Sequence, residues 1–599
     1  MPGANFKCAG FLNGALKTTL TLIALILVPL LQVAALAGAQ RPATRSAEAH
    51  YEQGLSLLQK EQFDRAISEL KSAIALKPSY ADAHNALGLA LARKGELQQA
   101  VESFRKAIEI DPKQYKALLN LGTALQQLGD IDGAIETFRQ SVAQKPDAAN
   151  GHALLGVALQ RKQLVNESIA ELREAVRLNS EMVEAHFYLG YGLAAKGELP
   201  AAVSEFEYVV KLKPDHGDAY YYLGTARWFA GNAVGAASAL RDAVRLNPKN
   251  ADAYYYLGLA LIKSGDSGAS TQEPRASSGL APDVAEPRHA MDQLLPENED
   301  LDEAIKSLRA ATALKPDYVD AYINLGLALV SRRDPDGAIA AFNSALKLQP
   351  NNQVAHHNLG MAFIQKGDYA AAIAEYQKLM ALAPDSAEAH YNLGLALKNK
   401  DQLGDAIVEL KRAIELQPSL QEAHYTLGVI LLQQSKLSEA ASAFGAAIKA
   451  KPDYAEARYA LGTVLQQQGK IEDAIAEFRE ALKQAPNAPE IHNTLGTALR
   501  QKGDMAAARV EFQEAARLNK KKSDMQAAMF AANTGRARLK EGNLDAAIER
   551  FEAAIKLYFD DASVHYDLAR SLSQKGLKEA AQAEYQKAKQ LNPRIKPLQ

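Results

Sequence analysis

The chain has 599 residues, of which 68 are basic and 70 acidic, so its formal net charge is −2. No basic stripe interrupts this balance, and nucleic-acid binding therefore has no electrostatic support in the sequence. A single cysteine, Cys8, excludes disulfide bonds within the chain and thiolate metal sites beyond residue 8.

The N-terminal residues differ in kind from the rest. Lys7 and Lys17 precede an apolar run at residues 18–39, which ends in small-x-small patterns around Ala37 and Ala39. This arrangement is typical of an export signal cleaved after one of those two alanines. We therefore expect an exported protein, periplasmic or extracellular, whose mature chain lacks cysteine.

An uncleaved membrane anchor is the alternative for the same segment, because about 20 apolar residues can span a bilayer. Residues 1–39 are accordingly a signal peptide or membrane anchor, and residues 40–46 a linker. Membrane contact is expected only if residues 18–39 are not cleaved.

From residue 47 onward a glycine recurs every 34 residues, which indicates a stack of similar supersecondary units rather than one globular core. When the positions of each repeat are numbered so that this glycine is slot 8, slot 7 is apolar, slots 20 and 27 are small, slot 24 is large and slot 32 is usually proline. In the second repeat these positions are Leu87, Gly88, Ala100, Phe104, Ala107 and Pro112.

The spacing of these slots predicts a pair of antiparallel helices in every repeat. Apolar slots fall three or four residues apart, which places them on one face of a helix. Slots 1–14 form a first helix and slots 18–31 a second one, which the slot-32 proline ends because proline cannot continue a helix. The small slots let the two helices approach closely, and the large slot fills the remaining space.

This slot pattern resembles the tetratricopeptide repeat (TPR), although slot 4 mostly holds histidine or tyrosine where the family usually has tryptophan. The resemblance implies an all-α, right-handed superhelical α-solenoid with a long concave face. Fifteen repeats, numbered 1 to 15 below, start at residues 47, 81, 115, 149, 183, 217, 251, 319, 353, 387, 421, 455, 489, 528 and 562.

An insert at residues 267–300 interrupts repeat 7 between its two helices. It contains four prolines and little apolar content, so we expect a largely disordered loop. A decayed repeat is the alternative, because the insert has the length of one repeat. Repeats 1–7 thus occupy residues 47–266, and the end of repeat 7 through repeat 13 occupies residues 301–522.

A second break, Ser523–Ala527, follows a run of three lysines. Ser523 and Gln526 have the spacing of a capping box, which predicts a longer first helix for repeat 14. A change of stacking angle at this point would make residues 523–599, with repeats 14 and 15, a semi-independent end block.

Most histidines recur in slot 4, which predicts a packing role and argues against a metal site. They are His50, His84, His152, His186, His356, His390, His424, His492 and His565. No nucleophile elbow or phosphate loop interrupts the repeats. We therefore expect no enzyme activity, no metal and no cofactor.

Slots 2, 5, 6, 9, 12 and 13 of the first helices are expected to face the concave groove. Repeats 5 to 7 concentrate aromatic side chains there, which are typical anchors for a bound peptide. These candidates are Phe187, Tyr188, Tyr191, Tyr221, Tyr222, Trp228, Phe229, Tyr255 and Tyr256. The alternative is that they pack between neighbouring helices.

Repeats 8 to 10 instead carry asparagine in slot 6, at Asn324, Asn358 and Asn392. A row of amides can hydrogen-bond the backbone of an extended peptide without reading its sequence. The row is similar to the asparagine ladder in the TPR superhelix of O-GlcNAc transferase. The alternative is an inherited family residue without a binding role.

These patterns predict an exported TPR scaffold that binds protein or peptide segments in its groove and mediates assembly of a complex. One alternative is a substrate-recruiting arm for an O-GlcNAc-transferase-like or other enzyme on a separate chain, because nothing here resembles the catalytic domain of that family. Another is a membrane-anchored assembly factor of an envelope machine. The fate of residues 18–39 distinguishes the anchored factor from the free scaffold.

Overall fold

A computed structural model describes residues 46–269, 299–558 and 561–592, together with 595, 597 and 598. The described residues form 29 α-helices and no strands, which confirms the prediction of an all-α solenoid. The expected signal or anchor, the linker up to residue 45 and most of the insert, residues 270–298, lie outside the described residues.

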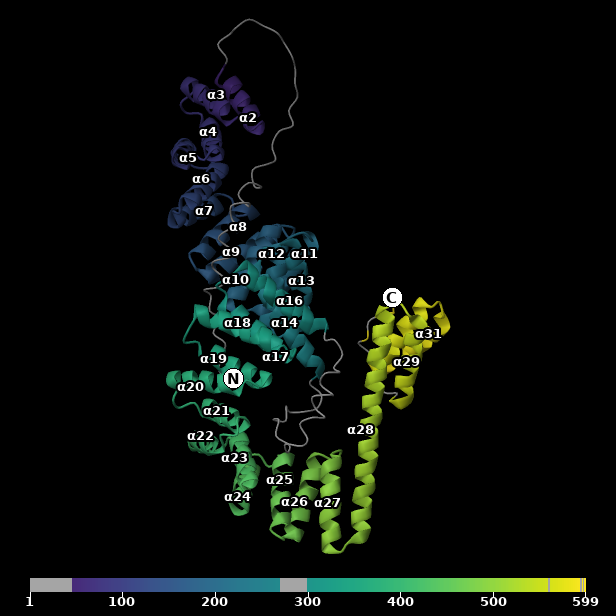
Figure 1. Cartoon of the computed structure of the whole chain (residues 1–599). Helices are drawn as coiled ribbons and strands as arrows, with labels where there is room; N and C mark the ends of the chain where they lie inside the picture. Colours follow the sequence, from purple (N-terminus) through teal and green to yellow (C-terminus); the bar gives the residue numbers. More distant parts are fainter. Residues whose placement is uncertain (1–45, 270–298, 559–560, 593–594, 596, 599) are drawn as a thin grey trace. The chain divides into compact units, whose positions relative to one another are not determined.

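The described residues divide into two compact parts, an N-terminal part that ends at Ser264 and a C-terminal part that begins at Gly265. In the N-terminal part, repeats 1 to 6 each consist of a first and a second helix, and α14 begins repeat 7 (Figure 1). The pairs are α2 (Ala47–Gln59) with α3 (Phe63–Leu76), α4 (Ala81–Lys94) with α5 (Leu97–Ile110), α6 (Tyr115–Leu128) with α7 (Ile131–Gln144), α8 (Ala149–Arg161) with α9 (Val165–Leu178), α10 (Val183–Lys196) with α11 (Leu199–Leu212), and α12 (Gly217–Phe229) with α13 (Ala233–Leu246), followed by α14 (Ala251–Ala269).

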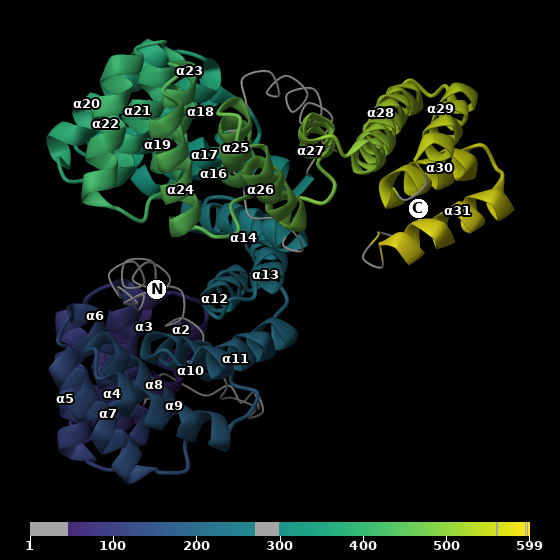
Figure 2. The ribbon, with the colours of Figure 1, turned by 90° about the horizontal axis from the view of Figure 1, so that it is seen from below.

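The C-terminal part begins with the second helix of repeat 7, α16 (Glu299–Leu314), and continues in the same manner (Figure 2). Its helices are α17 (Val319–Ser331) with α18 (Pro335–Leu348), α19 (Gln353–Lys366) with α20 (Tyr369–Leu382), α21 (Ala387–Asn399) with α22 (Leu403–Leu416), α23 (Gln421–Gln433) with α24 (Leu437–Ala450), α25 (Ala455–Gln467) with α26 (Ile471–Gln484), then α27 (Pro489–Lys502), α28 (Met505–Lys540), α29 (Leu544–Leu557), α30 (Ala562–Gln574) and α31 (Lys578–Leu591).

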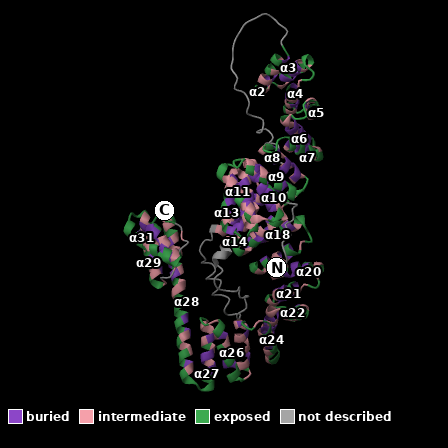
Figure 3. Cartoon of the chain, turned by 180° about the vertical axis from the view of Figure 1, so that it is seen from behind, coloured by how far each residue is buried: buried purple, intermediate pink, exposed green. Residues whose placement is uncertain are grey.

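The recurring glycine marks the place where the two helices of a repeat cross. A β-carbon at Gly428, in α23, would lie 2.7 Å from the ring of Phe444, the slot-24 residue of α24. The ring is fully buried, so the glycine is required by the close approach of the two helices. Figure 3 shows the resulting pattern, in which buried and exposed residues alternate around each helix.

A pair of alanine substitutions in repeat 11 tests this packing. We expect Gly428→Ala to destabilise the repeat by about 2 kcal/mol, because the added methyl group overpacks the core against Phe444. Gly445 lies in the middle of α24 with no atom within 4 Å of a β-carbon there. Gly445→Ala is therefore expected to stabilise the same repeat by about 0.5–1 kcal/mol through helix propensity. Chemical denaturation followed by circular dichroism measures both, and equal effects would contradict the packing role.

Within each part, the first helices of neighbouring repeats lie closer together than the second helices do. The first helices of consecutive repeats contact one another from α2 to α12 in the N-terminal part and from α17 to α27 in the C-terminal part. The second helices of consecutive repeats, as far as the structure describes them, make no comparable contacts. The stack of repeats within each part therefore curves, with the first helices on its inner side.

Two helices differ from the expected boundaries. First helices start at the predicted residue in every repeat except repeat 14, but α14 continues to Ala269, beyond the slot-14 end. The larger difference is α28, which joins the second helix of repeat 13 and the first helix of repeat 14 without a turn. Lys520 occupies slot 32, where most repeats have the proline that ends the second helix, and this substitution removes the stop signal.

Candidate interaction surface on the first helices

Side chains 35 residues apart link the first helices of neighbouring repeats. Slot 5 of one repeat meets slot 6 of the next, and slot 12 meets slot 13. The pairs are Asn120 Nδ2 to Asn85 Oδ1 at 2.9 Å, Tyr459 Oη to Thr494 Oγ1 at 3.2 Å and Gln466 Nε2 to Gln501 Oε1 at 2.8 Å. These slots therefore form one continuous surface within each part, which we call the first-helix surface.

In repeats 5 and 6 the slot-6 tyrosines do not lie open on this surface. Tyr188 and Tyr222 are only 8% and 6% exposed. The ring centroid of Tyr222 lies 5.7 Å from that of Phe187, 5.5 Å from that of Tyr191 and 5.9 Å from that of Phe206. The expectation that these tyrosines offer their rings to a groove is corrected, because each fills the junction between two repeats.

Other aromatic candidates of the N-terminal part are more accessible. Trp228 and Phe229 end α12, and Tyr255 and Tyr256 lie on α14. Phe229 is 41% exposed, and its ring centroid lies 5.9 Å from that of Tyr256. The ammonium group of Lys263 stands 5.3 Å from the Trp228 ring centroid, a cation–π contact. We call these five residues the aromatic patch.

Lys263 was not among the candidates from the sequence, although a signal for it existed. It follows Trp228 by 35 residues, the same step from slot 12 to slot 13 that links Gln466 to Gln501. Tyr221, also a candidate, is half-buried and packs edge-on against Tyr222 at 5.0 Å.

The asparagines of repeats 8 and 9 form hydrogen bonds inside their own helices. The amide groups of Asn324 and Asn358 each donate to the carbonyl four residues earlier in the same helix, both at 2.8 Å. Asn392 is buried, with 5% of its surface exposed. Of the three predicted amides, only those of Asn324 and Asn358 are partly accessible to a ligand. That they bind a peptide stays a prediction.

Two half-buried cations on the first-helix surface form no ion pair with any described residue. Arg161 lies in slot 13 of repeat 4 and Lys398 in slot 12 of repeat 10, and both are half-buried. Burial lowers the pKa of each side chain. No described residue forms an ion pair with either of them, so both suit an acidic group supplied by a ligand.

The slot-4 histidines connect neighbouring repeats. In repeat 5, His186 Nδ1 lies 2.5 Å from Glu205 of the same repeat, and Nε2 lies 3.0 Å from the carbonyl oxygen of Ser180, at the end of repeat 4. The same two contacts recur at His152, His356, His390 and His492. We call these five side chains the histidine ties.

The chemistry of the two acceptors fixes the number of protons in a tie. A carbonyl oxygen only accepts, so Nε2 must donate, and a neutral ring then has no second hydrogen for a carboxylate. In the tie of His186, whose pKa these contacts raise, a doubly protonated ring makes both contacts. Arg458, in slot 4 of repeat 12, makes both contacts with a permanent charge, to Glu477 at 3.0 Å and to the carbonyl of Pro452 at 3.1 Å.

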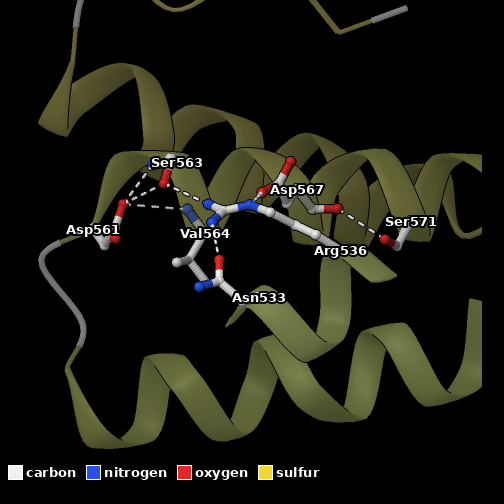
Figure 4. A network of polar contacts seen from close by, with 7 residues as sticks. All are labelled: Asn533, Arg536, Asp561, Ser563, Val564, Asp567 and Ser571. Atoms are coloured by element: carbon white, nitrogen blue, oxygen red, sulfur yellow. Dashed lines mark hydrogen bonds and ion pairs between the residues drawn. The ribbon is translucent and has the colours of Figure 1, made fainter. Parts of the chain in front are cut away.

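Polar side chains join the first helices of repeats 14 and 15 (Figure 4). Arg536 donates to Asp567 at 2.7 Å, to Ser563 at 2.9 Å and to Asn533 at 3.0 Å. Burial raises the pKa of Asp567, and the nearby guanidinium opposes that rise. Asp561 caps α30 by accepting from the backbone of Ser563 at 2.8 Å. This end of the surface holds no aromatic patch.

Other features of the described residues do not add a second candidate site. A pocket of about 660 Å³ lies between second helices α18 and α20, but its histidine and glutamate, His356 and Glu375, already belong to a tie. No described group of three metal-ligating side chains is placed to hold an ion. None of the described helices is both long and apolar enough to cross a membrane.

Comparison with known proteins identifies the repeat. Models of the tetratricopeptide repeat match residues 51–115, 158–217, 189–237, 221–270, 294–353, 397–455, 425–489, 459–527 and 533–594, with further matches at 91–157 and 360–401. No curated protein matches the chain.

Among solved structures, MamA is 31% identical over 27% of this chain and 95% of its own, with a TM-score of 0.26. YrrB, described as a TPR protein with an unusual peptide-binding site, is 26% identical over 31% of this chain and 95% of its own, with a TM-score of 0.29. Yeast Tom70 is 17% identical over 78% of this chain and 96% of its own, with a TM-score of 0.31.

The repeat models together cover more than half of the chain. Stacked repeats of this kind act as protein-interaction scaffolds, typically for protein or peptide partners, and are in general non-catalytic. The chain belongs to the tetratricopeptide repeat family.

Proposed function

We propose that the chain is an exported scaffold that holds protein or peptide segments against its first-helix surface and so mediates assembly of a complex. The aromatic patch on α12 and α14 is the observation that supports this most strongly. Four aromatic rings and a lysine lie on these two helices, and pairs among them are in contact. Phe229 stays 41% exposed, whereas Tyr188 and Tyr222 are buried.

The chemistry of the patch suits a peptide segment. Aromatic anchors contribute roughly 2 kcal/mol or more each when a partner covers them, so two of them suffice for a binding hot spot. The half-buried Arg161 and Lys398 add unpaired positive charge elsewhere on the first-helix surface, which favours segments that carry carboxylates. Export rests on the charged start, apolar run and small-residue end of residues 1–39.

Photocrosslinking from within the patch tests the proposal. A benzophenone amino acid at Phe229 is introduced into the full chain in its native envelope, and the same group at Val234, which is 69% exposed on the second helix α13, serves as the matched control. We expect discrete crosslinked partners from position 229 and none above background from position 234. N-terminal sequencing of the captured chain reports whether cleavage occurred after Ala37 or Ala39.

The partner is then confirmed by affinity. Trp228 is the only tryptophan of the chain, so its fluorescence reports directly on occupation of the patch. Peptides from the crosslinked segment should change this fluorescence, and Phe229→Ala should weaken binding about tenfold, or ~1.4 kcal/mol. Equal crosslinking from positions 229 and 234 would contradict binding at the patch, and an intact N-terminus in membranes would favour the anchored form.

A further inference from the structure

Slot 3 of the first helix reports whether a repeat is stacked on the one before it. It is alanine or glycine, and buried, in repeats 2 to 12, and it is Ile491 and Val564, each 3% exposed, in repeats 13 and 15. Two exceptions occur. Ala49 is exposed in repeat 1, the first repeat that the structure describes, and Phe530 of repeat 14 is 70% exposed.

The exposure of Phe530 follows from the continuous helix α28. The second helix of repeat 13 normally covers slot 3 of the next repeat, but here both segments belong to one rod from Met505 to Lys540. Two surfaces are thus exposed to solvent. One is the surface of repeat 13 that would contact the following repeat, and the other is the surface of repeat 14 that would contact the preceding repeat. Ala516, in slot 28 of repeat 13, is exposed on the same helix.

The two exposed surfaces are complementary in size. Where repeats 3 and 4 stack, a β-carbon at Gly151 in slot 3 would lie 3.4 Å from Val142 in slot 28, so these two slots touch. Most stacked junctions combine a small slot 3 with a larger apolar slot 28. On α28 the sizes of the two side chains are exchanged, because slot 3 holds the large Phe530 and slot 28 holds the small Ala516. A volume-conserving exchange of this kind keeps a packed interface filled.

We propose that a second copy of this chain covers these surfaces. The α28 helices of two copies lie antiparallel, with Phe530 of each packed on Ala516 of the other, so that repeat 14 of one copy completes repeat 13 of its partner. The interface is two-fold symmetric, because the antiparallel pairing uses the same residues of α28 on both copies.

The register of this pair is set by the contact between slots 28 and 3. When Phe530 of one copy contacts Ala516 of the other, each residue before Ser523 meets the residue that lies equally far after Ser523 in the other copy. Ser523, at the middle of α28, therefore lies on the two-fold axis. Next to the axis, Lys522 of one copy faces Asp524 of the other, which places opposite charges together. An exposed stripe follows the same face of the helix. It consists of Arg509, Gln513, Ala516, Asn519, Ser523, Ala527, Phe530 and Ala537.

A single chain reaches the same contact only by breaking α28 near Ser523. The helix has no proline or glycine from Met505 to Thr534, so nothing in its sequence favours a break there. A break would also release backbone hydrogen bonds that the rod forms. The second copy covers Phe530 without this cost.

Light scattering on the full chain tests the proposal. We expect a dimer, twice the 64.7 kDa of one chain. Phe530→Lys should raise the dimer dissociation constant at least tenfold, whereas Val510→Lys, which changes an exposed residue of α28 outside the stripe, should leave it unchanged. Lys522→Glu should weaken the dimer by placing two acidic groups together, and adding Asp524→Lys should restore it.

A cysteine at the two-fold axis provides an independent readout. In a Cys8→Ser background, Ser523→Cys should form a disulfide-linked dimer on oxidation, and Val510→Cys should not. A monomer, including a folded-back monomer in which Phe530 is protected, would overturn the proposal. A dimer that persists in Phe530→Lys would also overturn it. Crosslinking from Phe229 is a separate measurement, so failure here leaves the proposed function standing.

Discussion

Tyr222→Asn is expected to lower the free energy of unfolding of the N-terminal part by about 3 kcal/mol. The ring is 6% exposed and lies within 6 Å of Phe187, Tyr191 and Phe206, measured between centroids. Removing a buried aromatic ring from such a cluster leaves a cavity, and the shorter amide also brings a polar group into it. Loss of a large buried side chain accounts for an effect of this size.

Tyr256→Asn provides the matched control, because it makes the same substitution in the same slot one repeat later. Tyr256 is half-buried beside the exposed Phe229. We expect this change to cost less than about 1 kcal/mol of stability and to weaken capture of a peptide about tenfold. Denaturant titration by circular dichroism gives the stabilities. Equal stability of the two variants would contradict the claim that Tyr222 is part of the packed core and Tyr256 is not.

These two tyrosines show what the slot pattern determines and what it does not. A slot fixes the position of a residue on its helix, and the predicted starts of the first helices are therefore confirmed in all repeats but one. Burial also depends on the neighbouring repeat. Tyr222 meets Phe206 in slot 24 of the repeat before it, whereas Tyr256 follows a repeat with the smaller Leu240 in that slot. Periodicity alone contains no information about such pairs.

The junction of repeats 13 and 14 shows a second limit. The loss of the slot-32 proline at Lys520 was visible in the sequence, and a longer helix was expected from the capping-box spacing of Ser523 and Gln526. In the structure no cap forms, because both residues lie inside α28. The exchanged sizes of Ala516 and Phe530 acquire a meaning only once slots 28 and 3 are known to touch.

The histidine ties lead to the last prediction, a dependence of stability on pH. Burial of His186 opposes a charge on its ring, but hydrogen bonds to Glu205 and to the carbonyl of Ser180, together with the negative charge of Glu205, raise its pKa above the usual value. An unfolded histidine has a pKa of about 6.5. A group whose pKa is raised by folding stabilises the folded state fully below that unfolded value, and this contribution is lost as the pH rises through the folded pKa.

We therefore expect the stabilising contribution of the His186 tie to be full below pH 6.5 in the wild type, and to be lost as the pH rises above that value through the raised pKa of His186. His186→Arg places there the side chain that Arg458 already uses for both contacts, so it should keep the junction intact at high pH and reduce the slope. His424→Arg is the control, because His424 contacts the carbonyl of Pro418 and slot 23 of its repeat is Ala443. Melting temperatures at a series of pH values measure all three proteins. The slope should fall in His186→Arg and stay unchanged in His424→Arg, and a wild type whose stability rose over this pH range would refute the charged ring, since the linkage then has the opposite sign.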